Sequence, residues 1–319
     1  MTPEEWLRNR ERAAKQIIER ASKEKLTELN LSRLNLKELP PEIVNCKHLT
    51  RLDLSHNNIT SIPEVLGQLS ELRSLSLSYN NITCVSEAIG QLSSLTWLSL
   101  SSNSITCISE ALGQLSNLTG LSLSSNQITS LPEAVGQLSH LTLLDLTYNK
   151  IICIPEALGQ LSNLTNLYLG SNKITSIPEA LGQLSELRLL SLDNNQISFI
   201  PNALGQLSNL TEFRLNRNKI TSIPEALGQL SKLQLLSLDN NQITFIPDAL
   251  GQLSHLTSFY IYNNQITLIP ETLGQLSNLT HLYLDKDQIT SIPETLRDMQ
   301  KRGILVVGGI SDLFNFYSD

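Results

Sequence analysis

The stretch LTRLDLSHNNITSIP, residues 49–63, decides the fold. It places leucine at the first, fourth and sixth positions, asparagine at the ninth, and Ile-Pro at the end. The frame returns every 23 residues, and ten copies carry the ninth-position asparagine: Asn57, Asn80, Asn103, Asn126, Asn149, Asn172, Asn195, Asn218, Asn241 and Asn264. Asp287 stands in the next such place, and a degenerate earlier copy begins at Leu26. A period of this length, kept in register, predicts a solenoid of stacked turns.

The residues of one repeat predict its local structure. In the Leu-x-Leu segment, alternate side chains point into the core and the intervening ones point out of a strand. Stacked repeats then place these strands side by side in a parallel sheet. We therefore predict an α/β solenoid, a right-handed horseshoe with a concave parallel sheet of roughly 12 strands and short helices or turns on its convex side.

The conserved frame also contains a turn and a return segment. Each ninth-position asparagine offers one acceptor and two donors, so the stacked column is predicted to satisfy the turns above and below it. The return segment IPEALGQLS, residues 154–162, suits a short helix that proline opens, glutamate stabilises and glycine ends. The stacked glutamates Glu133, Glu156 and Glu179 could suggest a cation site, but helix-end electrostatics accounts for them without a metal.

Both ends of a solenoid need caps, because a terminal repeat leaves one apolar face uncovered. We predict a capping helix in residues 1–25, the solenoid in residues 26–299 and a C-terminal cap in residues 300–319. Residues 303–308 are predicted to form a final strand. Three apolar residues after it would cover the last core layer: Leu313, Phe314 and Phe316.

The N-terminal capping helix is predicted to run from Pro3 to about Ala21. Thr2 and Glu5 have the spacing of a capping box, which satisfies free backbone donors at a helix start. The predicted apolar face of this helix consists of Trp6, Ala13, Ile17 and Ala21.

Composition excludes several classes of protein. The net charge of −7 gives no basic footprint for nucleic acid or an anionic membrane, and no apolar run approaches a membrane span or signal peptide. We therefore expect a cytoplasmic protein. The four cysteines Cys46, Cys84, Cys107 and Cys153 are too few for a disulfide scaffold. Cys84 and Cys107 lie one turn apart, so a disulfide is sterically conceivable, but we interpret them as stacked small side chains.

No catalytic constellation is found in the sequence. The histidines are scattered among the repeats: His48, His56, His140, His255 and His281. No histidine occupies a place that could activate Cys84 or Cys107 as a nucleophile. No phosphate loop of the type GxxxxGK[ST] occurs, either. We therefore predict a non-enzymatic protein without a cofactor or metal.

The 23-residue frame with Ile-Pro resembles the intracellular leucine-rich repeats of Scribble- and Erbin-type scaffolds and the Ras-suppressor family. The opening helix followed by LNLS, residues 29–32, and LKELPPEI, residues 36–43, resembles bacterial repeat proteins more closely, including the front ends of Roco proteins. The resemblance covers roughly residues 26–299 and implies a curved solenoid that binds protein on its concave sheet. The chain departs from these families in two ways. Ser86 and Ser109 replace proline, accompanied by Cys84 and Cys107, and the Roco resemblance stops short of the GTPase, whose phosphate loop is missing from the sequence.

The outward positions of the strand segment are the third, fifth, seventh and eighth of each repeat. In the earlier repeats these positions are mainly serine, whereas later ones carry tyrosine, arginine, leucine and aspartate. Tyrosine, tryptophan and arginine often dominate binding energy, although aromatics also simply suit an exposed sheet. The predicted partner-binding residues are Trp97, Leu143, Tyr148, Tyr168, Leu189, Asp193, Arg214, Arg217, Leu235, Asp239, Tyr260, Tyr262 and Tyr283.

An internal duplication supports this prediction. Residues 162–186 and 208–232 differ at six positions, five of which lie in the strand segment. Four of these five point outward: Asn166/Glu212, Tyr168/Arg214, Gly170/Asn216 and Ser171/Arg217. The convex-side positions are unchanged, and the second duplicated pair, 187–208 and 233–254, keeps its outward strand residues identical. The concave face thus alternates a fixed strand with a diversified one.

The leading hypothesis is a cytoplasmic scaffold or adaptor that binds a protein or peptide on the concave sheet. One alternative is an effector or surface protein delivered without a classical signal. Another is a detached regulatory module that acts on a GTPase in trans. The sequence leaves the partner and the oligomeric state open.

Overall fold

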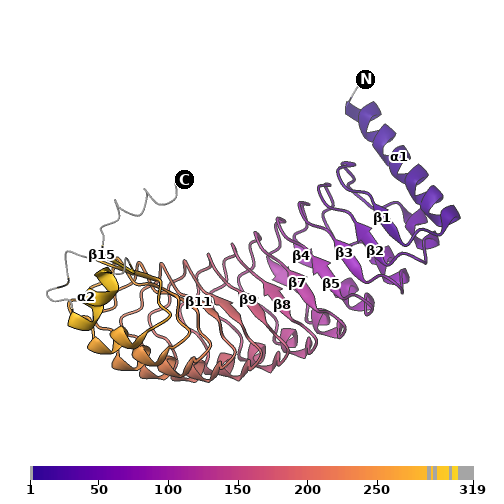
Figure 1. Ribbon diagram of the computed structural model, residues 1–319. Helices are drawn as coiled ribbons and strands as arrows, with labels where there is room; N and C mark the ends of the chain where they lie inside the picture. Colours follow the sequence, from indigo (N-terminus) through magenta and orange to yellow (C-terminus); the bar gives the residue numbers. More distant parts are fainter. Residues whose placement is uncertain (1–2, 286–288, 290–292, 302–303, 308–319) are drawn as a thin grey trace. The chain divides into compact units, whose positions relative to one another are not determined.

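The computed structural model describes residues 3–285, 289, 293–301 and 304–307 (Figure 1). The chain divides into two compact units, unit 1 from Met1–Ile151 and unit 2 from Ile152–Asp319. Both units are stacks of 23-residue turns, and we describe each unit by itself. The predicted repeat solenoid is confirmed within each of them.

Unit 1 begins with helix α1 (Pro3–Glu24). A parallel sheet follows, in which each strand pairs in register with the strand one repeat later. Its strands are β1 (Glu28–Asn30), β2 (Arg51–Asp53), β3 (Ser74–Ser76), β5 (Trp97–Ser99), β7 (Gly120–Ser122) and β8 (Leu143–Asp145). The strands are three residues long because only the middle leucine of each must enter the core, and the flanking residues face solvent.

Unit 2 continues the same arrangement, and each of its strands is again parallel to the next. Its strands are β9 (Asn166–Tyr168), β10 (Leu189–Ser191), β11 (Glu212–Arg214), β12 (Leu235–Ser237), β13 (Ser258–Tyr260), β14 (His281–Leu284) and β15 (Leu305–Val307). Helix α2 (Glu294–Lys301) precedes β15. The predicted final strand is confirmed by the pairing of β15 with β14. Leu313, Phe314 and Phe316 lie outside the described residues.

The return segments are short 3-10 helices of five residues each. In unit 1 they are η1 (Pro41–Asn45), η2 (Glu64–Gln68), η3 (Glu87–Gln91), η4 (Glu110–Gln114) and η5 (Glu133–Gln137). In unit 2 they are η6 (Glu156–Gln160), η7 (Glu179–Gln183), η8 (Asn202–Gln206), η9 (Glu225–Gln229), η10 (Asp248–Gln252) and η11 (Glu271–Gln275). The glycine was expected to end this turn, but Gly182 lies inside η7. A Cβ there would stand 2.4 Å from the carbonyl oxygen of Ala203, so glycine permits the close approach of the next repeat.

The leucines and isoleucines of the frame form a continuous core in each unit, and nearly all of them are fully buried. Beside this core, the side-chain amides of the ninth-position asparagines form hydrogen bonds with the backbone of the turns. Asn195 is typical: its Nδ2 donates to the carbonyls of Leu169 and Leu192, both at 3.0 Å. Its Oδ1 accepts from the backbone N–H of Ile174 at 2.9 Å. Each such amide therefore joins its own turn to the preceding repeat.

The N-terminal helix covers the first repeat with a different face from the predicted one. Ala14, Ile18 and Ala21 are buried, whereas Ala13 is half-buried and Ile17 is exposed. The prediction was therefore wrong at Ala13 and Ile17. The sequence offers apolar residues on both sides of the helix, and only the position of the first repeat selects between them. Thr2 of the proposed capping box lies outside the described residues.

The interpretation of Cys84 and Cys107 as unbonded stacked side chains was wrong, because the structure joins them in a disulfide. They belong to a second, two-stranded parallel sheet, β4 (Cys84–Val85) and β6 (Cys107–Ile108). This pairing places their Cα atoms 4.9 Å apart, within the range that a disulfide spans. Cys46 is buried and Cys153 is exposed, and both are free. Burial raises the pKa of the Cys46 thiol.

Candidate partner-binding surface

We define the strand face of unit 2 as the third, fifth, seventh and eighth positions of its repeats. The in-register parallel pairing aligns equivalent positions of successive strands in columns. The fifth-position column reads Tyr168, Ser191, Arg214, Ser237, Tyr260 and Tyr283. The structure thus brings four of the predicted partner-binding residues into one row. The two serines between them are buried, so the large side chains form the accessible part of the row.

The end of this row is aromatic. The rings of Tyr260 and Tyr283 stack with their centroids 5.0 Å apart and their planes 8° from parallel. His281, on the same strand as Tyr283, lies beside it at 6.3 Å between centroids. Both tyrosines are half-buried. The stack holds two rings in one orientation before any partner arrives, which lowers the conformational entropy lost on binding.

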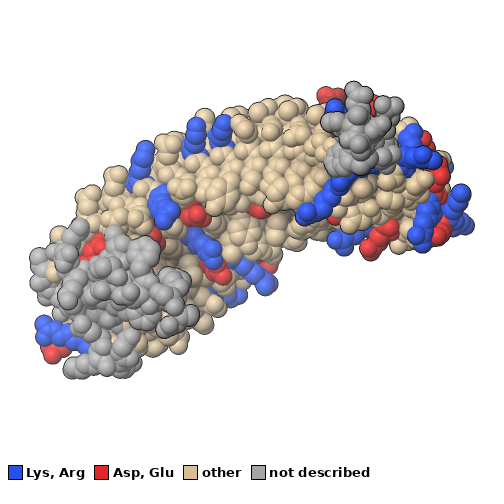
Figure 2. All heavy atoms as spheres, turned by 90° about the horizontal axis from the view of Figure 1, so that it is seen from above, with Lys and Arg blue, Asp and Glu red and all other residues tan. Residues whose placement is uncertain are grey.

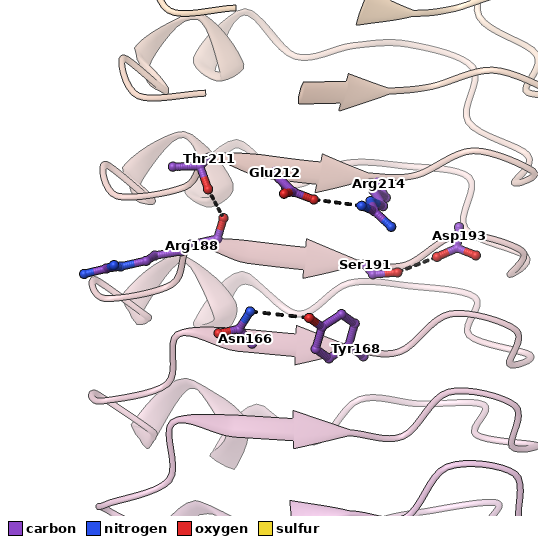
Figure 3. A network of polar contacts seen from close by, with 8 residues as sticks. All are labelled: Asn166, Tyr168, Arg188, Ser191, Asp193, Thr211, Glu212 and Arg214. Atoms are coloured by element: carbon purple, nitrogen blue, oxygen red, sulfur yellow. Dashed lines mark hydrogen bonds and ion pairs between the residues drawn. The ribbon is translucent and has the colours of Figure 1, made fainter. Parts of the chain in front are cut away.

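The two duplicated strands β9 and β11 carry different polar pairs at the same positions (Figure 3). In β9, Asn166 Nδ2 lies 3.5 Å from the hydroxyl of Tyr168. In β11, the equivalent pair is an ion pair in which Arg214 Nη2 lies 2.8 Å from Glu212 Oε2. Both partners of the pair changed together between the copies. Because Arg214 and Glu212 are exposed, this ion pair contributes little to stability, and its effect is on the charge of the surface.

The duplicated aspartates Asp193 and Asp239 occupy different surroundings. Ser191 Oγ donates to Asp193, which stays half-exposed (Figure 3). Asp239 is only 6% exposed, and it accepts from Ser237 Oγ and from Asn240 Nδ2, each at 2.7 Å. Burial, together with the Asp239 carboxylate, raises the pKa of Tyr262 to about 12. Asp239 is therefore less accessible to a partner than Asp193.

The remaining predicted residues are distributed over both units. Leu189 and Leu235 are half-buried, and Arg217 is exposed. Trp97, Leu143 and Tyr148 belong to unit 1 and face outward from its own sheet, with Tyr148 66% exposed. The charged groups stand singly among uncharged residues on much of the surface seen in Figure 2. A partner would therefore meet mainly uncharged residues there.

Sequence reasoning missed the backbone conformation at the eighth position. In ten repeats this residue has a φ between 54° and 57°, in the left-handed region: His56, Tyr79, Ser102, Ser125, Tyr148, Ser171, Asn194, Arg217, Asn240 and Asn263. Asparagine tolerates this conformation better than other side chains, so its presence in three of these repeats was the available signal.

Sequence reasoning also missed exposed apolar side chains beside the turn. Phe199, Phe245 and Leu268 are more than half exposed. They occupy the thirteenth position of their repeats, where other repeats carry serine or cysteine. That substitution pattern was the available signal. Nothing in the structure shows what covers these side chains.

The described residues contain no group of three or more His, Cys, Asp or Glu side chains that could hold a metal ion. Within the same ranges, no helix has both the length and the apolar character required to cross a bilayer.

Comparisons with known proteins identify the repeat. A family model described as a leucine-rich repeat region matches residues 21–127 and 107–222. Two further leucine-rich-repeat models match residues 232–289 and 208–255. No curated protein matches the chain.

Solved structures resemble the chain over most of its length. The plant peptide hormone receptor RGFR1 in complex with RGF2 is 32% identical, with a TM-score of 0.71, over 78% of this chain and 42% of the receptor chain. The PEPR1–AtPEP1 structure is 32% identical, with a TM-score of 0.66, over 81% of this chain and 41% of that one. An internalin (inlF) from Listeria monocytogenes is 26% identical, with a TM-score of 0.72, over 90% of this chain and 91% of the internalin chain.

This chain therefore spans less than half of the RGFR1 and PEPR1–AtPEP1 chains and nearly the whole of the internalin chain. The family models together cover well over half of its residues. The chain belongs to the leucine-rich-repeat family.

Proposed function

We propose that this chain is a non-enzymatic binding module that holds a protein or peptide partner on the strand face of unit 2. The observation that carries the proposal is the fifth-position row, in which the sheet register aligns Tyr168, Arg214, Tyr260 and Tyr283. Aromatic and arginine side chains on a rigid sheet are the residues most often responsible for binding energy. The preformed Tyr260–Tyr283 stack supports the same interpretation.

The comparisons support a binding role of this kind. This chain contains a leucine-rich repeat region, and the plant peptide hormone receptor RGFR1, which it resembles over 78% of its length, was solved in complex with RGF2. The duplication adds support from within the chain, because the strand face of β11 differs from that of β9 while the return segments remain identical. Differences concentrated on one face support the idea that the identity of its side chains affects function.

The Cys84–Cys107 disulfide favours the hypothesis of an exported or surface protein over that of a cytoplasmic scaffold. Disulfides persist in oxidising compartments and are reduced in the cytosol of most organisms. Fractionation of the native cells, combined with thiol labelling of Cys84 and Cys107, tests this hypothesis. A chain recovered from the cytosol with both thiols free would contradict it.

The binding surface is tested with variants that introduce serine into the row. Serine already occupies this column at Ser191 and Ser237. Arg214→Ser and Tyr260→Ser therefore introduce a side chain that the sheet already accommodates there. We expect each variant to bind the captured partner at least ~30-fold more weakly, equivalent to about 2 kcal/mol, if its residue is a binding hot spot. Affinity is measured by calorimetry with a partner isolated on the wild-type chain.

Glu225→Gln is the matched control, because Glu225 is exposed in η9 on the return segment. It should bind as the wild type does. Unchanged affinity in both serine variants, with Glu225→Gln weakened, would place the partner on the return segments and contradict the proposal.

A further inference from the structure

Unit 1 has a hollow on its own strand face, separate from the row of unit 2. The hollow has a volume of about 430 Å³ and lies over three neighbouring strands, β2, β3 and β5. Its solvent-facing lining consists of Arg51, Asp53, Ser74, Ser76, Trp97 and Ser99. The serine side chains are short, so they form the floor of the hollow. Arg51 and Asp53 of β2 lie on one side of this floor, and the indole of β5 lies on the other. Of these lining residues, only Trp97 is among the partner-binding residues that the sequence predicts.

A glycine leaves room for the indole of Trp97 against the neighbouring strand. Gly120 on β7 is the register partner of Trp97. A Cβ at Gly120 would stand 2.2 Å from both Cε3 and Cζ3 of the Trp97 ring, so the ring occupies the space that a side chain would fill. One side of the indole therefore rests on the strand, and the residue remains 40% exposed. An exposed indole in a fixed orientation is a platform for a flat, partly apolar group.

Polar groups surround this platform. The hydroxyls of Ser99 and Ser78 are hydrogen-bonded at 2.7 Å, and each hydroxyl retains further donor or acceptor capacity. Asp53 Oδ1 accepts from the backbone N–H of Ser55 at 2.9 Å, which fixes the carboxylate beside the floor. Arg51 is exposed and forms no ion pair with any described residue. The hollow thus presents an indole, hydroxyls, a carboxylate and a guanidinium together.

The Cys84–Cys107 disulfide ties together the two repeats that build most of the hollow. Cys84 follows β3, which carries Ser74 and Ser76, and Cys107 follows β5, which carries Trp97. The bond restrains the separation of these repeats on the side where the chain turns away from the sheet. Restraining this separation keeps the distance between the serine floor and the indole constant, as a preorganised site requires.

We propose that this hollow binds a saccharide. A pyranose ring presents an apolar C–H face to an indole and several hydroxyls to short polar side chains, carboxylates and guanidinium groups. A lysine or phenylalanine side chain from a protein partner would use only part of this lining. The mixed lining therefore fits a sugar better than a single amino-acid side chain.

Fluorescence of Trp97 tests the proposal directly. The chain has two tryptophans, so Trp6→Phe leaves Trp97 as the single indole. The full chain with this change is titrated, up to tens of millimolar, with cellotetraose, maltotetraose and an N-acetylglucosamine tetramer. N-acetyl-lysine amide and N-acetyl-phenylalanine amide are titrated as competing probes. We expect at least one saccharide to produce a saturable change in the fluorescence of Trp97. The two amides should leave the fluorescence unchanged.

Two variants locate the binding site. Ser76→Leu fills the floor of the hollow, and Arg51→Ala removes its guanidinium. Each should weaken saccharide binding at least about tenfold. Ser122→Leu makes the same change in the equivalent place on β7, outside the lining, and should leave binding unchanged. Circular dichroism confirms that each variant folds, and titration by calorimetry repeats the measurement without the fluorophore.

Several outcomes would overturn the proposal. They are no response to any of the three saccharides, a response to an amide probe alone, or equal weakening by Ser76→Leu and Ser122→Leu. This test does not depend on the proposed function. The variants that test that function, Arg214→Ser and Tyr260→Ser, lie in unit 2 and change no residue of the hollow.

Discussion

At the scale of the residue, the eighth position of the repeat combines an uncommon backbone conformation with an outward side chain. Tyr148 has a φ of 56° and is 66% exposed. Left-handed backbone places the Cβ of an L-residue close to the following carbonyl oxygen, at a cost that asparagine and glycine largely avoid. Asn194, Asn240 and Asn263 occupy the equivalent position in other repeats. A tyrosine here is therefore retained at some expense of stability.

Replacing Tyr148 with asparagine should stabilise the protein. The expected gain is about 0.5–1 kcal/mol, since the side chain loses little packing and the backbone strain is relieved. Chemical denaturation measures the change as a shift of the midpoint to higher denaturant. The matched control is Asn240→Tyr, which should shift the midpoint the other way. If Tyr148→Asn destabilises the chain, the tyrosine contributes packing that its exposure does not reveal.

At the scale of the element, β4 and β6 set their two repeats apart from the others. Proline opens most return segments, but Ser86 and Ser109 open η3 and η4. Serine keeps the backbone N–H that proline lacks, and the N–H of Ser109 donates to the carbonyl of Val85 at 2.9 Å. The serine substitution thus allows the small sheet to form, and the sheet aligns Cys84 with Cys107.

The disulfide between these elements should stabilise unit 1. Cys84 and Cys107 are 23 residues apart, and closing a loop of this length restricts the unfolded chain by about 3 kcal/mol. The double variant Cys84→Ser with Cys107→Ser should lose about 2–4 kcal/mol in denaturant unfolding under oxidising conditions. Cys153→Ser, at an exposed free cysteine, is the control and should be neutral. Equal stability of the double variant and the wild type would show that the bond restrains nothing.

At the scale of the whole molecule, the main contacts between elements within each unit join neighbouring repeats of the described residues. The element contacts join successive return segments and successive strands, and α1 contacts η1. Stability in such a protein is approximately a sum of repeat and interface contributions, so a local defect remains local. The N-terminal helix contributes to this sum by covering the first repeat with Ala14, Ile18 and Ala21.

Ile18→Ala should therefore weaken the N-terminal cap without affecting unit 2. Ile18 is fully buried, and truncating such a side chain costs about 2–5 kcal/mol. Hydrogen exchange should show lost protection in α1 and the first repeats, with residues 152–285 unchanged. Ile17→Ala removes the neighbouring exposed isoleucine and should have little effect. Loss of protection throughout the chain would show that the repeats unfold as one cooperative unit.

Much of this structure follows from the sequence because the 23-residue period repeats the same local physics in each turn. Leu52, Leu54 and Asn57 in one repeat already predict a strand, a core layer and a turn. The parallel register follows as well, since equal repeat lengths place equivalent residues side by side. The alignment of Tyr168, Arg214 and Tyr260 in one row was accessible for this reason.

Features that depend on distances between side chains of different repeats were decided only by the tertiary structure. The helix periodicity does not distinguish Ile18 from Ile17, and the choice comes from where the first repeat packs. The disulfide depends on a 4.9 Å Cα separation that spacing alone leaves open. The hollow beside Trp97 requires Gly120 to lie under its ring. A repeating sequence determines what each turn looks like, whereas packing between turns determines which side chains touch.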